Sequence, residues 1–354
     1  MSKSTVLVVG TGLIGTSIAL GLVALDHVVY LADSNPDALE TAIAKSGAQR
    51  WDGDSQADIV VVATPPAVTG SVIREMVRSQ QRAVITDVSS VKGSIFEELS
   101  DLDSHSLSRI VGGHPMAGRE VSGAASAISN LFVDRSWVIT RNEFTSDESF
   151  STVEGLTLEL GAVPISRSIA DHDRAVALVS HTPQVVASVL AAQLLNAEEK
   201  DIELAGQGLR DTIRIASSNA DLWQQILAGN ATQVAHQVTS VAHDLAEVAR
   251  ALLDSDQQGI EDVLVRGSKG RDRLPGKHGT ARKDMATISV RLADQPGELA
   301  RLFAVAAAAS VNLEDVRIDH SLGRMTGLVE LTVEPASVVT LERALTSADF
   351  TVVT

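Results

Sequence analysis

Residues 5–15 read TVLVVGTGLIG, a β-branched run that passes directly into a turn with glycine at positions 10, 12 and 15. A strand followed by G-x-G-x-x-G and then by a helix, here expected over residues 17–25, is typical of a dinucleotide-binding unit. The glycines allow a tight turn, and the N-terminus of the helix presents unpaired N–H groups to a pyrophosphate. We therefore expect this turn to contact a dinucleotide, through Gly10, Thr11, Gly12, Leu13, Ile14 and Gly15.

A second expected strand, residues 27–32 (HVVYLA), ends in Asp33. This acid stands at about the distance from the glycine turn at which such units carry their ribose-binding acid. Its carboxylate would accept a hydrogen bond from the ribose 2′-hydroxyl and repel a 2′-phosphate, which favours NAD over NADP. The alternative role is a cap of the next helix, although Asn35 and Pro36 suit that position. Together with the glycine turn, Asp33 predicts NAD as the cofactor.

Strands and helices continue to alternate beyond this unit. Further β-type runs at 58–63 (DIVVVA), 83–86 (AVIT) and 109–111 are separated by helical stretches. This alternation predicts an α/β domain of the Rossmann type, a doubly wound parallel sheet covered on both faces. Ligands bind beyond the carboxyl ends of the strands in such sheets. The glycine or polar positions at those ends are Gly10, Asp33, Thr64, Ser89, Ser90 and His114.

Residues 110–120, IVGGHPMAGRE, carry the candidate base. His114 stands between a flexible glycine pair and the stiff Pro115, at the expected end of a strand. Histidine has the side-chain pKa nearest neutrality and suits proton transfer. The alternative is a turn whose histidine caps a backbone carbonyl. Two other positions at the strand ends, Thr64 and Ser89, are candidates for cofactor binding, and a plain turn role stays open for Ser89.

The pattern changes to long helical periodicity between residues 168 and 253. The first expected helix, 171–195, carries His181 and Gln184 on one face, with Pro183 between them and a kink expected there. A later helix, 232–253, has the pattern of an amphipathic packing helix. By analogy with other folds, a helical unit after a nucleotide domain completes the substrate site and forms a dimer.

Between those helices, residues 208–216 read GLRDTIRIA. Arg210 and Arg214 lie one helical turn apart, and Asp211 can pair with Arg214. The alternative is that these residues form a solvated charged face with an internal ion pair, which would contribute little to stability. The apolar neighbours, however, indicate that at least one guanidinium points out of an apolar environment, where it could hold an anion.

The composition narrows the class of partner. The formal net charge is −16, which argues against nucleic acid and anionic membranes because both need a basic surface. An anionic substrate must then be held by a few local arginines. Cysteine is absent, so we expect no disulfide, no thiolate metal site and a reducing, cytoplasmic location. We name no other metal-binding residue. Residues 1–3 lead directly into a strand, which leaves no signal peptide, and no apolar run is expected to span a membrane.

Residues 266–284 (RGSKGRDRLPGKHGTARK from 266 to 283) are dense in glycine, proline and positive charge. This composition predicts a loop or linker between domains. The alternative is that the segment covers the active site and lends positive charge to the substrate.

The remaining residues, 285–354, show the order β-α-β-β-α-β. Strands are expected at 286–292, 311–320, 325–333 and 350–353, with a hairpin turn at 321–324 and helices at 298–309 and 335–347. This order predicts a ferredoxin-like α+β domain. DQPGELARLF followed by VNLEDVRI resembles the ACT domain, which often binds an amino acid, and a purely structural lobe is the alternative.

GTGLIG, TDVSSVKG, GGHPMAGRE, VSHTPQ and LRDTIRIASSN occur in this order. Together they resemble the prephenate/arogenate dehydrogenase family of tyrosine biosynthesis over about residues 5–255. The resemblance implies an oxidative decarboxylation of a small anionic cyclohexadienyl substrate with NAD(P)+, a Rossmann-type domain (1–165) and an all-α dimerisation domain (166–265). The preference for NAD rests on Asp33. The basic linker (266–284) and the ACT-like domain (285–354) would follow. Tyrosine is the effector that the pathway suggests.

The resemblance also implies residue roles. His114 would accept the hydrogen bond of the ring hydroxyl, and Ser90 would orient that hydroxyl and the nicotinamide. Arg214 matches the arginine that binds the substrate carboxylate, while Glu120 and Asp211 match acids that pair with it. Substrate-site candidates are thus Arg214, His181, Gln184, Glu120, Arg210 and Asp211.

One departure from the family pattern leaves the substrate open. His181 matches the first histidine of the family's H-x-P-H motif, but the second is Gln184 here. Prephenate and arogenate therefore both stay candidates. Dehydrogenases of the 3-hydroxyacid or 6-phosphogluconate type share the build but place a catalytic lysine on the helical domain, and the first long helix here carries none. A catalytically silent sensor of NAD and an amino acid is the alternative from another class.

Overall fold

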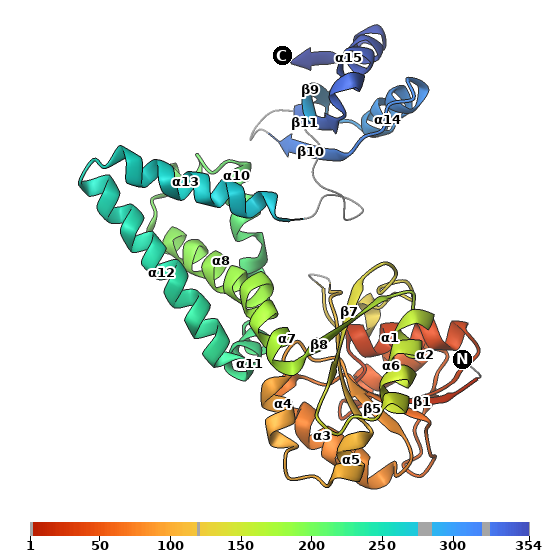
Figure 1. Ribbon diagram of the computed structural model, residues 1–354. Coiled ribbons are helices and arrows are strands. Elements are labelled where there is room, and N and C mark those ends of the chain that lie inside the picture. Colours follow the sequence, from red (N-terminus) through yellow and green to blue (C-terminus); the bar gives the residue numbers. More distant parts are fainter. Residues whose placement is uncertain (1–2, 119–120, 275–284, 321–325, 354) are drawn as a thin grey trace. The chain divides into compact units, whose positions relative to one another are not determined.

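The computed structural model describes residues 3–118, 121–274, 285–320 and 326–353 (Figure 1). The chain divides into two compact units, Met1–His243 and Asp244–Thr354. Glu120, an expected substrate-site residue, lies outside the described residues, as do Arg119 and residues 275–284 of the expected linker.

The first unit is built on an eight-stranded sheet of order β3-β2-β1-β4-β5-β6-β7-β8. All neighbouring strands are parallel except β6 and β7. The first six strands in this order form the doubly wound arrangement of a Rossmann-type domain, as predicted. The strands are β1 (Thr5–Val9), β2 (Val28–Ala32), β3 (Gln49–Arg50), β4 (Ile59–Val62), β5 (Val84–Asp87), β6 (Ile110–Pro115), β7 (Ser136–Arg141) and β8 (Val163–Ser168).

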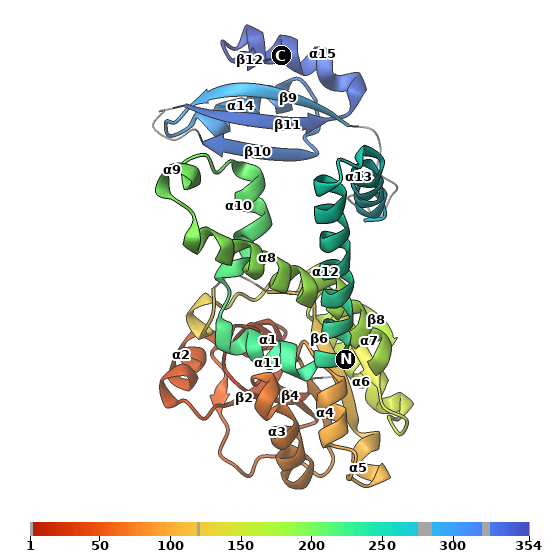
Figure 2. The ribbon, with the colours of Figure 1, turned by 90° about the vertical axis from the view of Figure 1, so that its left-hand side faces the viewer.

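Helices cover both faces of this sheet (Figures 1 and 2). Side chains alternate along β1, so that Val6 and Val8 belong to one hydrophobic core while Leu7 belongs to the other. Both cores are fully buried at these positions. The helices of the first core are α1 (Leu13–Ala24), α2 (Pro36–Ser46) and α6 (Asp147–Glu159), and those of the second are α3 (Pro66–Ser79), α4 (Gly93–Glu98) and α5 (Ser104–Ser108).

Two boundaries differ from expectation. Helix α1 begins at Leu13, four residues before the expected start, because the glycine turn is already the N-terminus of the helix. The expectation that the strand at 109–111 ends before the glycine pair is wrong. Strand β6 continues to Pro115, since residues 111–115 pair antiparallel with β7, a strand that sequence patterning did not predict. His114 is therefore held inside a strand rather than beyond it.

The helical segment after β8 starts with α7 (Ile169–Val176), a π turn (Ala177–His181) and α8 (Thr182–Gln193). The irregularity expected near Pro183 is this π turn. Proline has no N–H to donate to the preceding turn, and a π turn of this kind is common at functional sites. It turns His181 inward, where the side chain is buried.

The run Ile169–Asn196 is long and apolar enough, by length and composition alone, to cross a membrane. This corrects the expectation that no such run exists. The helix nevertheless contains the buried polar residues His172, Asp173, His181 and Gln184, all of which have hydrogen-bond partners inside the first unit. A helix that packs against the core of a domain can show the same apolar character.

Helix α11 joins the helical segment to the nucleotide domain. Ile226 is buried in the same hydrophobic core as α3 and α4, and Trp223 packs against that core. The backbone N–H of Ala67 on α3 also donates to Gln225 Oε1, 3.3 Å away. The helices that follow α8 are α9 (Glu199–Ile202), α10 (Gln207–Ile213), α11 (Ala220–Gly229) and α12 (Ala231–Leu253), with a 3₁₀ turn at Arg214–Ser217.

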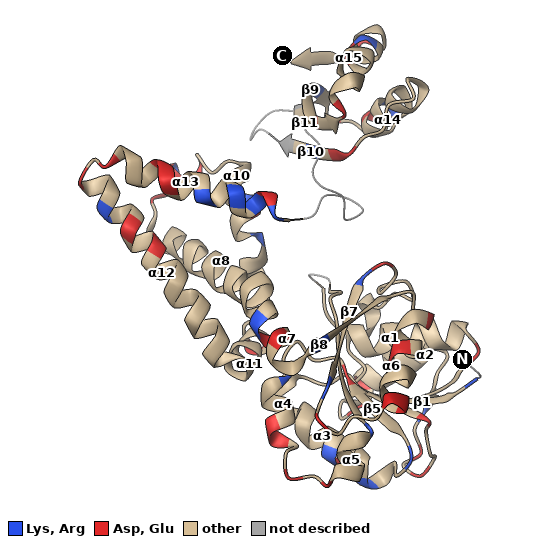
Figure 3. Cartoon of the chain, in the orientation of Figure 1, with Lys and Arg blue, Asp and Glu red and all other residues tan. Residues whose placement is uncertain are grey.

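In the second unit, α13 (Gln257–Asp272) replaces the beginning of the expected loop. Residues 266–272 are helical because Asp256 caps a helix that starts well upstream. Lys269 and Arg271 then lie in its last turn, where positive charge is favourable. In Figure 3 the last turns of α13 are largely blue, the colour of Lys and Arg.

The rest of the second unit is a four-stranded antiparallel sheet of order β10-β11-β9-β12. One core joins it to two helices through Leu302 and Leu341, both fully buried. The expected hairpin turn at 321–324 lies outside the described residues. The elements are β9 (Ala286–Ala293), α14 (Glu298–Ala308), β10 (Asp315–His320), β11 (Thr326–Val333), α15 (Val338–Ser347) and β12 (Thr351–Val353).

Candidate active site

The glycine turn between β1 and α1 has the shape that a pyrophosphate requires. Gly10 has a φ of +102°, and a Cβ there would lie 2.4 Å from the carbonyl oxygen of Ala63. A Cβ on Gly15 would lie 2.0 Å from the carbonyl oxygen of Gly10. A Cβ on Gly12 would meet nothing within 4 Å, and no side chain caps the helix there. Gly10 and Gly15 are thus required for the close approach of neighbouring backbone. Gly12 leaves the helix N-terminus open to a ligand.

Asp33 lies at the end of β2, beside this turn. Its Oδ2 accepts hydrogen bonds from the backbone N–H of Thr11 at 2.6 Å and from the Thr11 hydroxyl at 2.8 Å. Its Oδ1 accepts from the N–H of Asn35 at 2.8 Å. The helix cap considered for Asp33 is made by Asn35 instead, which accepts from residues 37 and 38. The carboxylate is therefore held beside the glycine turn, and its contact with a ribose stays a prediction.

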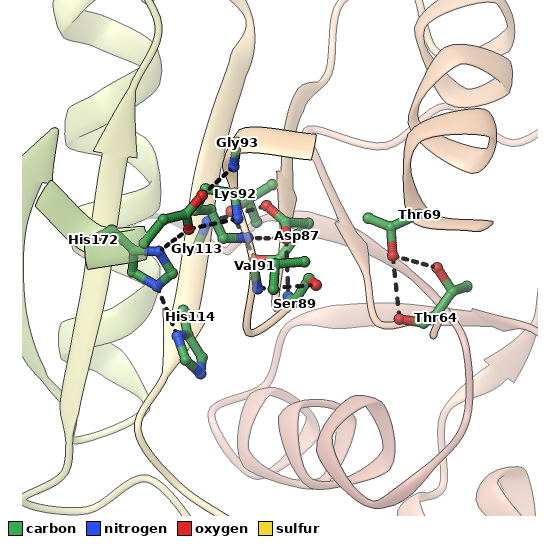
Figure 4. Close-up of polar contacts among 12 residues, drawn as sticks. Thr64, Thr69, Asp87, Ser89, Val91, Lys92, Gly93, Gly113, His114 and His172 are labelled. Atoms are coloured by element: carbon green, nitrogen blue, oxygen red, sulfur yellow. Dashed lines mark hydrogen bonds and ion pairs between the residues drawn. The ribbon is translucent and has the colours of Figure 1, made fainter. Parts of the chain in front are cut away.

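The loop after β5 carries a buried ion pair. Lys92 is fully buried, and its ammonium contacts the carboxylate of Asp87 (Figure 4). Asp87 also accepts from the backbone N–H of Ser89 at 2.9 Å and of Gly113 at 3.2 Å. Burial lowers the pKa of Lys92, while the Asp87 and Asp173 carboxylates oppose that shift. The pair fixes the loop 88–92 against β6.

The glycine pair of β6 makes room for this cluster. A Cβ on Gly112 would lie 2.2 Å from the Thr140 hydroxyl and 3.0 Å from Lys92 Cδ. A Cβ on Gly113 would lie 2.4 Å from the carbonyl oxygen of Asp87. Neither glycine has a positive φ. These glycines are thus required for close packing rather than for a turn, contrary to the flexibility expected of them.

His114 is the next residue of β6, and it faces a second histidine. Its Nδ1 lies 2.8 Å from Nε2 of His172 on α7, and His172 Nδ1 lies 2.8 Å from Oδ1 of Asp173 (Figure 4). Asp173 also accepts from the backbone N–H groups of Lys92 at 3.0 Å and Gly93 at 2.7 Å. The candidate base is thus connected to an acid that bridges α7 and the loop after β5.

These surroundings keep His114 neutral. Burial, followed by the nearby His172, Lys92 and His181, holds the pKa of His114 well below its usual range. Burial alone would raise the pKa of Asp173, but hydrogen bonds from His172 and the backbone N–H groups of the loop outweigh it, so that the pKa is lowered. The site therefore offers a neutral imidazole backed by a charged carboxylate.

His181 is connected to the same cluster through Asn230. The Asn230 side-chain amide donates to the carbonyl oxygen of Asp173 at 2.8 Å and lies 3.3 Å from His181 Nδ1. Since an amide nitrogen only donates, Nδ1 accepts and Nε2 carries the proton. Nε2 is buried and has no hydrogen-bond partner among the described residues. Burial, and then the nearby His172, lower the pKa of His181 to about 4 even though Asp173 opposes the shift.

Gln184 connects this site to residues 205–217, the segment that carries Arg210 and Arg214. Its side-chain amide donates to the carbonyl oxygen of Ile215 at 3.0 Å, one residue after Arg214. Asp211 Oδ1 accepts from Gln207 at 2.8 Å, and Arg210 contacts the carbonyl oxygen of Ala205. Gln184 thus links the helix of His181 to the turn that carries Arg214.

Three further candidates, Thr64, Ser89 and Ser90, follow strands β4 and β5. The Ser89 hydroxyl accepts from the N–H of Val91 at 3.4 Å, which is the turn role left open for it. Thr64, at the end of β4, contacts the Thr69 hydroxyl at 3.1 Å. Ser90 is half-buried in the same loop as Ser89. Cofactor and substrate contacts of these three residues stay predictions.

Sequence patterning missed the polar support of His114, namely Asp87, Lys92, His172, Asp173 and Asn230. The adjacent pair His172-Asp173, shortly after the helix-capping Ser168, was a usable signal, because two side chains of opposite role stand at the start of an apolar helix. Asp87 was visible as a charge at the end of an otherwise apolar strand, whereas Lys92 reads as a surface residue. Asn230 had no such signal, since only the fold brings α11 to α7.

A Rossmann-type sheet with an open glycine turn, an acid at the end of β2 beside that turn and a neutral buried histidine at the same sheet edge is the arrangement of an NAD-dependent dehydrogenase. Comparison with known families gives the narrower assignment. Residues 19–166 match the nucleotide-binding domain of prephenate dehydrogenase, and residues 168–266 match its dimerization domain. The chain belongs to the prephenate dehydrogenase family.

Individual relatives agree with this assignment. The chain is 32% identical to "Probable prephenate dehydrogenase NovF" of Streptomyces niveus over 94% of both chains, and 27% identical to prephenate dehydrogenase of Bacillus subtilis over 93% and 92%. Among solved structures, prephenate dehydrogenase of A. aeolicus in complex with hydroxyphenyl propionate and NAD+ is 25% identical, with a TM-score of 0.70 over 77% of this chain and 98% of that one. Synechocystis arogenate dehydrogenase is 27% identical, with a TM-score of 0.65 over 76% and 99%.

Proposed function

We propose that the protein converts prephenate to 4-hydroxyphenylpyruvate with NAD+ in tyrosine biosynthesis. One observation carries the proposal: the buried, neutral His114 stands at the same edge of the parallel sheet as the glycine turn. Oxidation of a ring alcohol with loss of CO2 needs a proton acceptor beside a hydride acceptor, and this edge offers both. Names carried by the relatives, at 27–32% identity, support the same reaction.

His114 is the proposed base. When bound, NAD+ supplies the hydride acceptor for the ring carbon that bears the hydroxyl. His114 Nε2 accepts the proton of that hydroxyl, because Nδ1 is occupied by His172. A positioned base of this kind contributes ~10²–10⁴-fold in rate. Loss of CO2 then leaves an aromatic ring, so that the reaction runs in one direction. Ser90, half-buried in the neighbouring loop, is proposed to orient the hydroxyl.

The substrate carboxylates are the second requirement. Arg214 is proposed to bind one of them, since a guanidinium forms two parallel hydrogen bonds to a carboxylate and stays charged. His181 supports the site in a different way, because its buried Nε2–H is a donor with no acceptor in the described part of the chain. A bound carboxylate or hydroxyl would satisfy it. Arg210, Asp211 and Glu120 stay predicted contributors to this side of the site.

Arogenate is the second candidate substrate, and Gln184 is the observation that favours it. Arogenate carries an ammonium group where prephenate carries a keto group. Gln184 offers an amide oxygen as well as an amide nitrogen, and its Oε1 lies 3.4 Å from the Ser218 hydroxyl, a weak contact that a ligand can replace. A histidine at this position would offer a ring N–H and a ring nitrogen instead of an amide N–H and an amide oxygen. The likeness to Synechocystis arogenate dehydrogenase supports keeping this alternative.

The direct test is NADH formation by the purified chain with prephenate and, in parallel, with arogenate. We expect NADH and 4-hydroxyphenylpyruvate from prephenate. A clear preference for arogenate would replace the substrate but keep the enzyme class. Absence of NADH with both substrates, in a protein that binds NAD+, would favour the sensor alternative and reject the proposal.

A homodimer is part of the proposal. The helix that begins at Ile169 exposes several large apolar side chains, of which Val179, Val189 and Leu195 are 62%, 58% and 87% exposed. The match of residues 168–266 to a dimerization domain supports their burial against a second copy. Such a dimer, rather than a membrane, would account for the apolar run, and a cytoplasmic location remains our expectation. Sedimentation of the full chain tests the dimer.

For the C-terminal unit we propose the ferredoxin-like ACT arrangement with a regulatory role. Counting its four strands in chain order, the sheet runs second-third-first-fourth, which is the order that a βαββαβ unit produces. Gly297, at φ +95°, makes the turn into α14 after the first strand. Tyrosine is the proposed effector, from the pathway alone. Inhibition of NADH formation by added tyrosine tests it. The domain limits given above, at residues 165, 265 and 284, belong to the same proposal.

A further inference from the structure

The geometry points to a positioning role for two residues that do not meet the substrate. We propose that Asp173, acting through His172, holds His114 in the tautomer with its proton on Nδ1. His172 then shares the positive charge that forms when His114 accepts a proton, and Asp173 stabilises it. The proposal rests on the function proposed above, in which His114 is the base.

The direction of each hydrogen bond follows from the acceptor at the end of the row. Asp173 is charged and can only accept, so His172 Nδ1, 2.8 Å away, carries a proton. In the proposed row His172 is a neutral imidazole with one N–H, so its Nε2 is an acceptor. His114 Nδ1, 2.8 Å from that atom, must then donate. The remaining ring nitrogen, His114 Nε2, keeps its lone pair for a ligand.

Asp173 is itself held in place by the nucleotide domain. Its two oxygens accept from the backbone N–H groups of Lys92 and Gly93, at 3.0 and 2.7 Å. His172 is fully buried and Asp173 nearly so. Because every member of the row is packed or hydrogen-bonded, the tautomer is determined before any substrate arrives. Because the tautomer is set in advance, His114 does not have to change its protonation pattern when the substrate binds.

The charges around the row favour a cation on the two rings. Asp87 and Lys92 form one neutral pair, and Asp173 is a further carboxylate without a matching cation among the described neighbours. The His114 and His172 rings therefore face one carboxylate beyond the Asp87–Lys92 pair. An imidazolium formed at His114 restores neutrality within a buried cluster, where charge interactions are strong.

The proton is accounted for at each step. The substrate O–H bond breaks and a new N–H bond forms at His114 Nε2, which leaves His114 with two N–H groups and a positive charge. The Nδ1 proton of His114 already lies on the hydrogen bond to His172 Nε2. Its movement along that bond places the charge on His172, directly beside Asp173. No other acceptor is required: loss of CO2 leaves the ring oxygen as a phenolate, and His114 Nε2 returns the proton to it, so that the product leaves with its hydroxyl and both histidines are neutral again.

His172 is the residue to change, because Asp173 also anchors the loop 88–92. His172→Phe removes the acceptor for His114 Nδ1, whereas His172→Gln keeps an acceptor oxygen but cannot take a proton. His105→Gln on the exposed face of α5 is the matched control for loss of a histidine. Long-range ¹⁵N–¹H spectra of ¹⁵N-histidine-labelled protein report the tautomer without substrate, and His114→Asn assigns the His114 signals.

We expect wild-type His114 as the Nδ1–H tautomer, a partial or complete change to Nε2–H in His172→Phe, and retention of Nδ1–H in His172→Gln. The kcat of His172→Phe should fall on the order of 10²-fold with little change in the KM of the substrate or in NAD+ binding. His172→Gln should restore part of that loss, and His105→Gln should match wild type in both measurements.

An Nε2–H tautomer in the wild-type protein would overturn the proposal, as would wild-type kcat in a folded His172→Phe protein. If His172→Phe does not fold, the wild-type spectrum and the kcat of His172→Gln still decide, since a kcat equal to wild type in the glutamine variant excludes charge sharing. Failure of the proposed reaction is separate, because it would abolish NADH formation in every protein while the tautomer of His114 stays measurable.

Discussion

The carboxylate of Asp173 accepts a hydrogen bond from the backbone N–H of Gly93 at a distance of 2.7 Å. Asp173 belongs to the first helix after the nucleotide domain, and Gly93 begins α4 inside that domain. A single side chain therefore sets the distance between the loop that carries Ser90 and the helix that carries His172. The candidate site is assembled at this junction and belongs to neither segment alone.

The glycine turn gives a matched pair of variants. Gly15→Ala would place a Cβ 2.0 Å from a backbone oxygen, so the backbone must shift, and we expect a loss of about 1–3 kcal/mol in the free energy of unfolding. Gly12→Ala meets no atom within 4 Å and should unfold close to wild type, but its methyl group occupies the approach of the pyrophosphate. Thermal unfolding and NAD+ titration of both variants separate the two effects. Equal NAD+ affinity of Gly12→Ala and wild type would contradict the assignment of this turn.

Asp33 should determine the choice of cofactor. Asp33→Ser removes the charged acceptor for the ribose 2′-hydroxyl and the repulsion of a 2′-phosphate, so the KM for NAD+ should rise about 10- to 10²-fold. The KM for NADP+ should fall. Asp37→Asn, in the first turn of the next helix, is the control and should change neither constant. Unchanged discrimination in Asp33→Ser would mean that another group reads the ribose.

Arg214 should act on binding more than on turnover. Loss of a hydrogen bond to a charged group corresponds to ~1.5–3 kcal/mol, so the KM of Arg214→Ala for prephenate should rise about 10- to 10²-fold with a smaller change in kcat. Arg214→Lys keeps the charge but loses the planar pair of donors and should lie between the two. Arg174→Ala breaks only an exposed ion pair with Asp171 and serves as control. A large fall in kcat at unchanged KM would assign Arg214 a different role.

His181 should make the fold sensitive to acid. Its native pKa is about 4 against an ordinary value of 6.5, so the unfolded chain binds more protons between these two values. Protonation therefore favours unfolding, and stability decreases as pH falls from about 6.5 towards 4. His181→Gln, which can still accept from Asn230, should reduce this slope, while His105→Gln should not. Urea unfolding at several pH values measures it, and equal slopes for all three proteins would refute the assignment.

Sequence patterning predicted the parts of the molecule whose signal is local. The β-branched run before Gly10, the strand before Asp33 and the alternation that follows identify the sheet, because hydrophobic periodicity and glycine spacing depend on neighbours in the chain. The βαββαβ order of the C-terminal unit is visible for the same reason. Candidate residues at strand ends, such as His114, follow from the topology of parallel sheets.

What patterning missed depends on contacts between distant segments. Strand β7 pairs with β6 and draws His114 into the sheet. Its run WVIT is typical of a strand, but its antiparallel pairing with β6 depends on a contact that the local sequence does not specify. Lys92 reads as a surface residue until the fold buries it beside Asp87. Asn230 becomes part of the site only because α11 returns to α7. At residues 266–272 the local composition was misleading, since a helix begun at Asp256 continues through two glycines.

The most direct measurement is the turnover of prephenate by wild type and His114→Asn, with NAD+ binding determined on the same samples. The account predicts NADH formation by the wild-type protein, intact NAD+ binding by the variant, and a kcat for the variant that is lower by ~10²–10⁴-fold at little change in the KM for prephenate. A folded His114→Asn protein that turns over prephenate at the wild-type rate would contradict it.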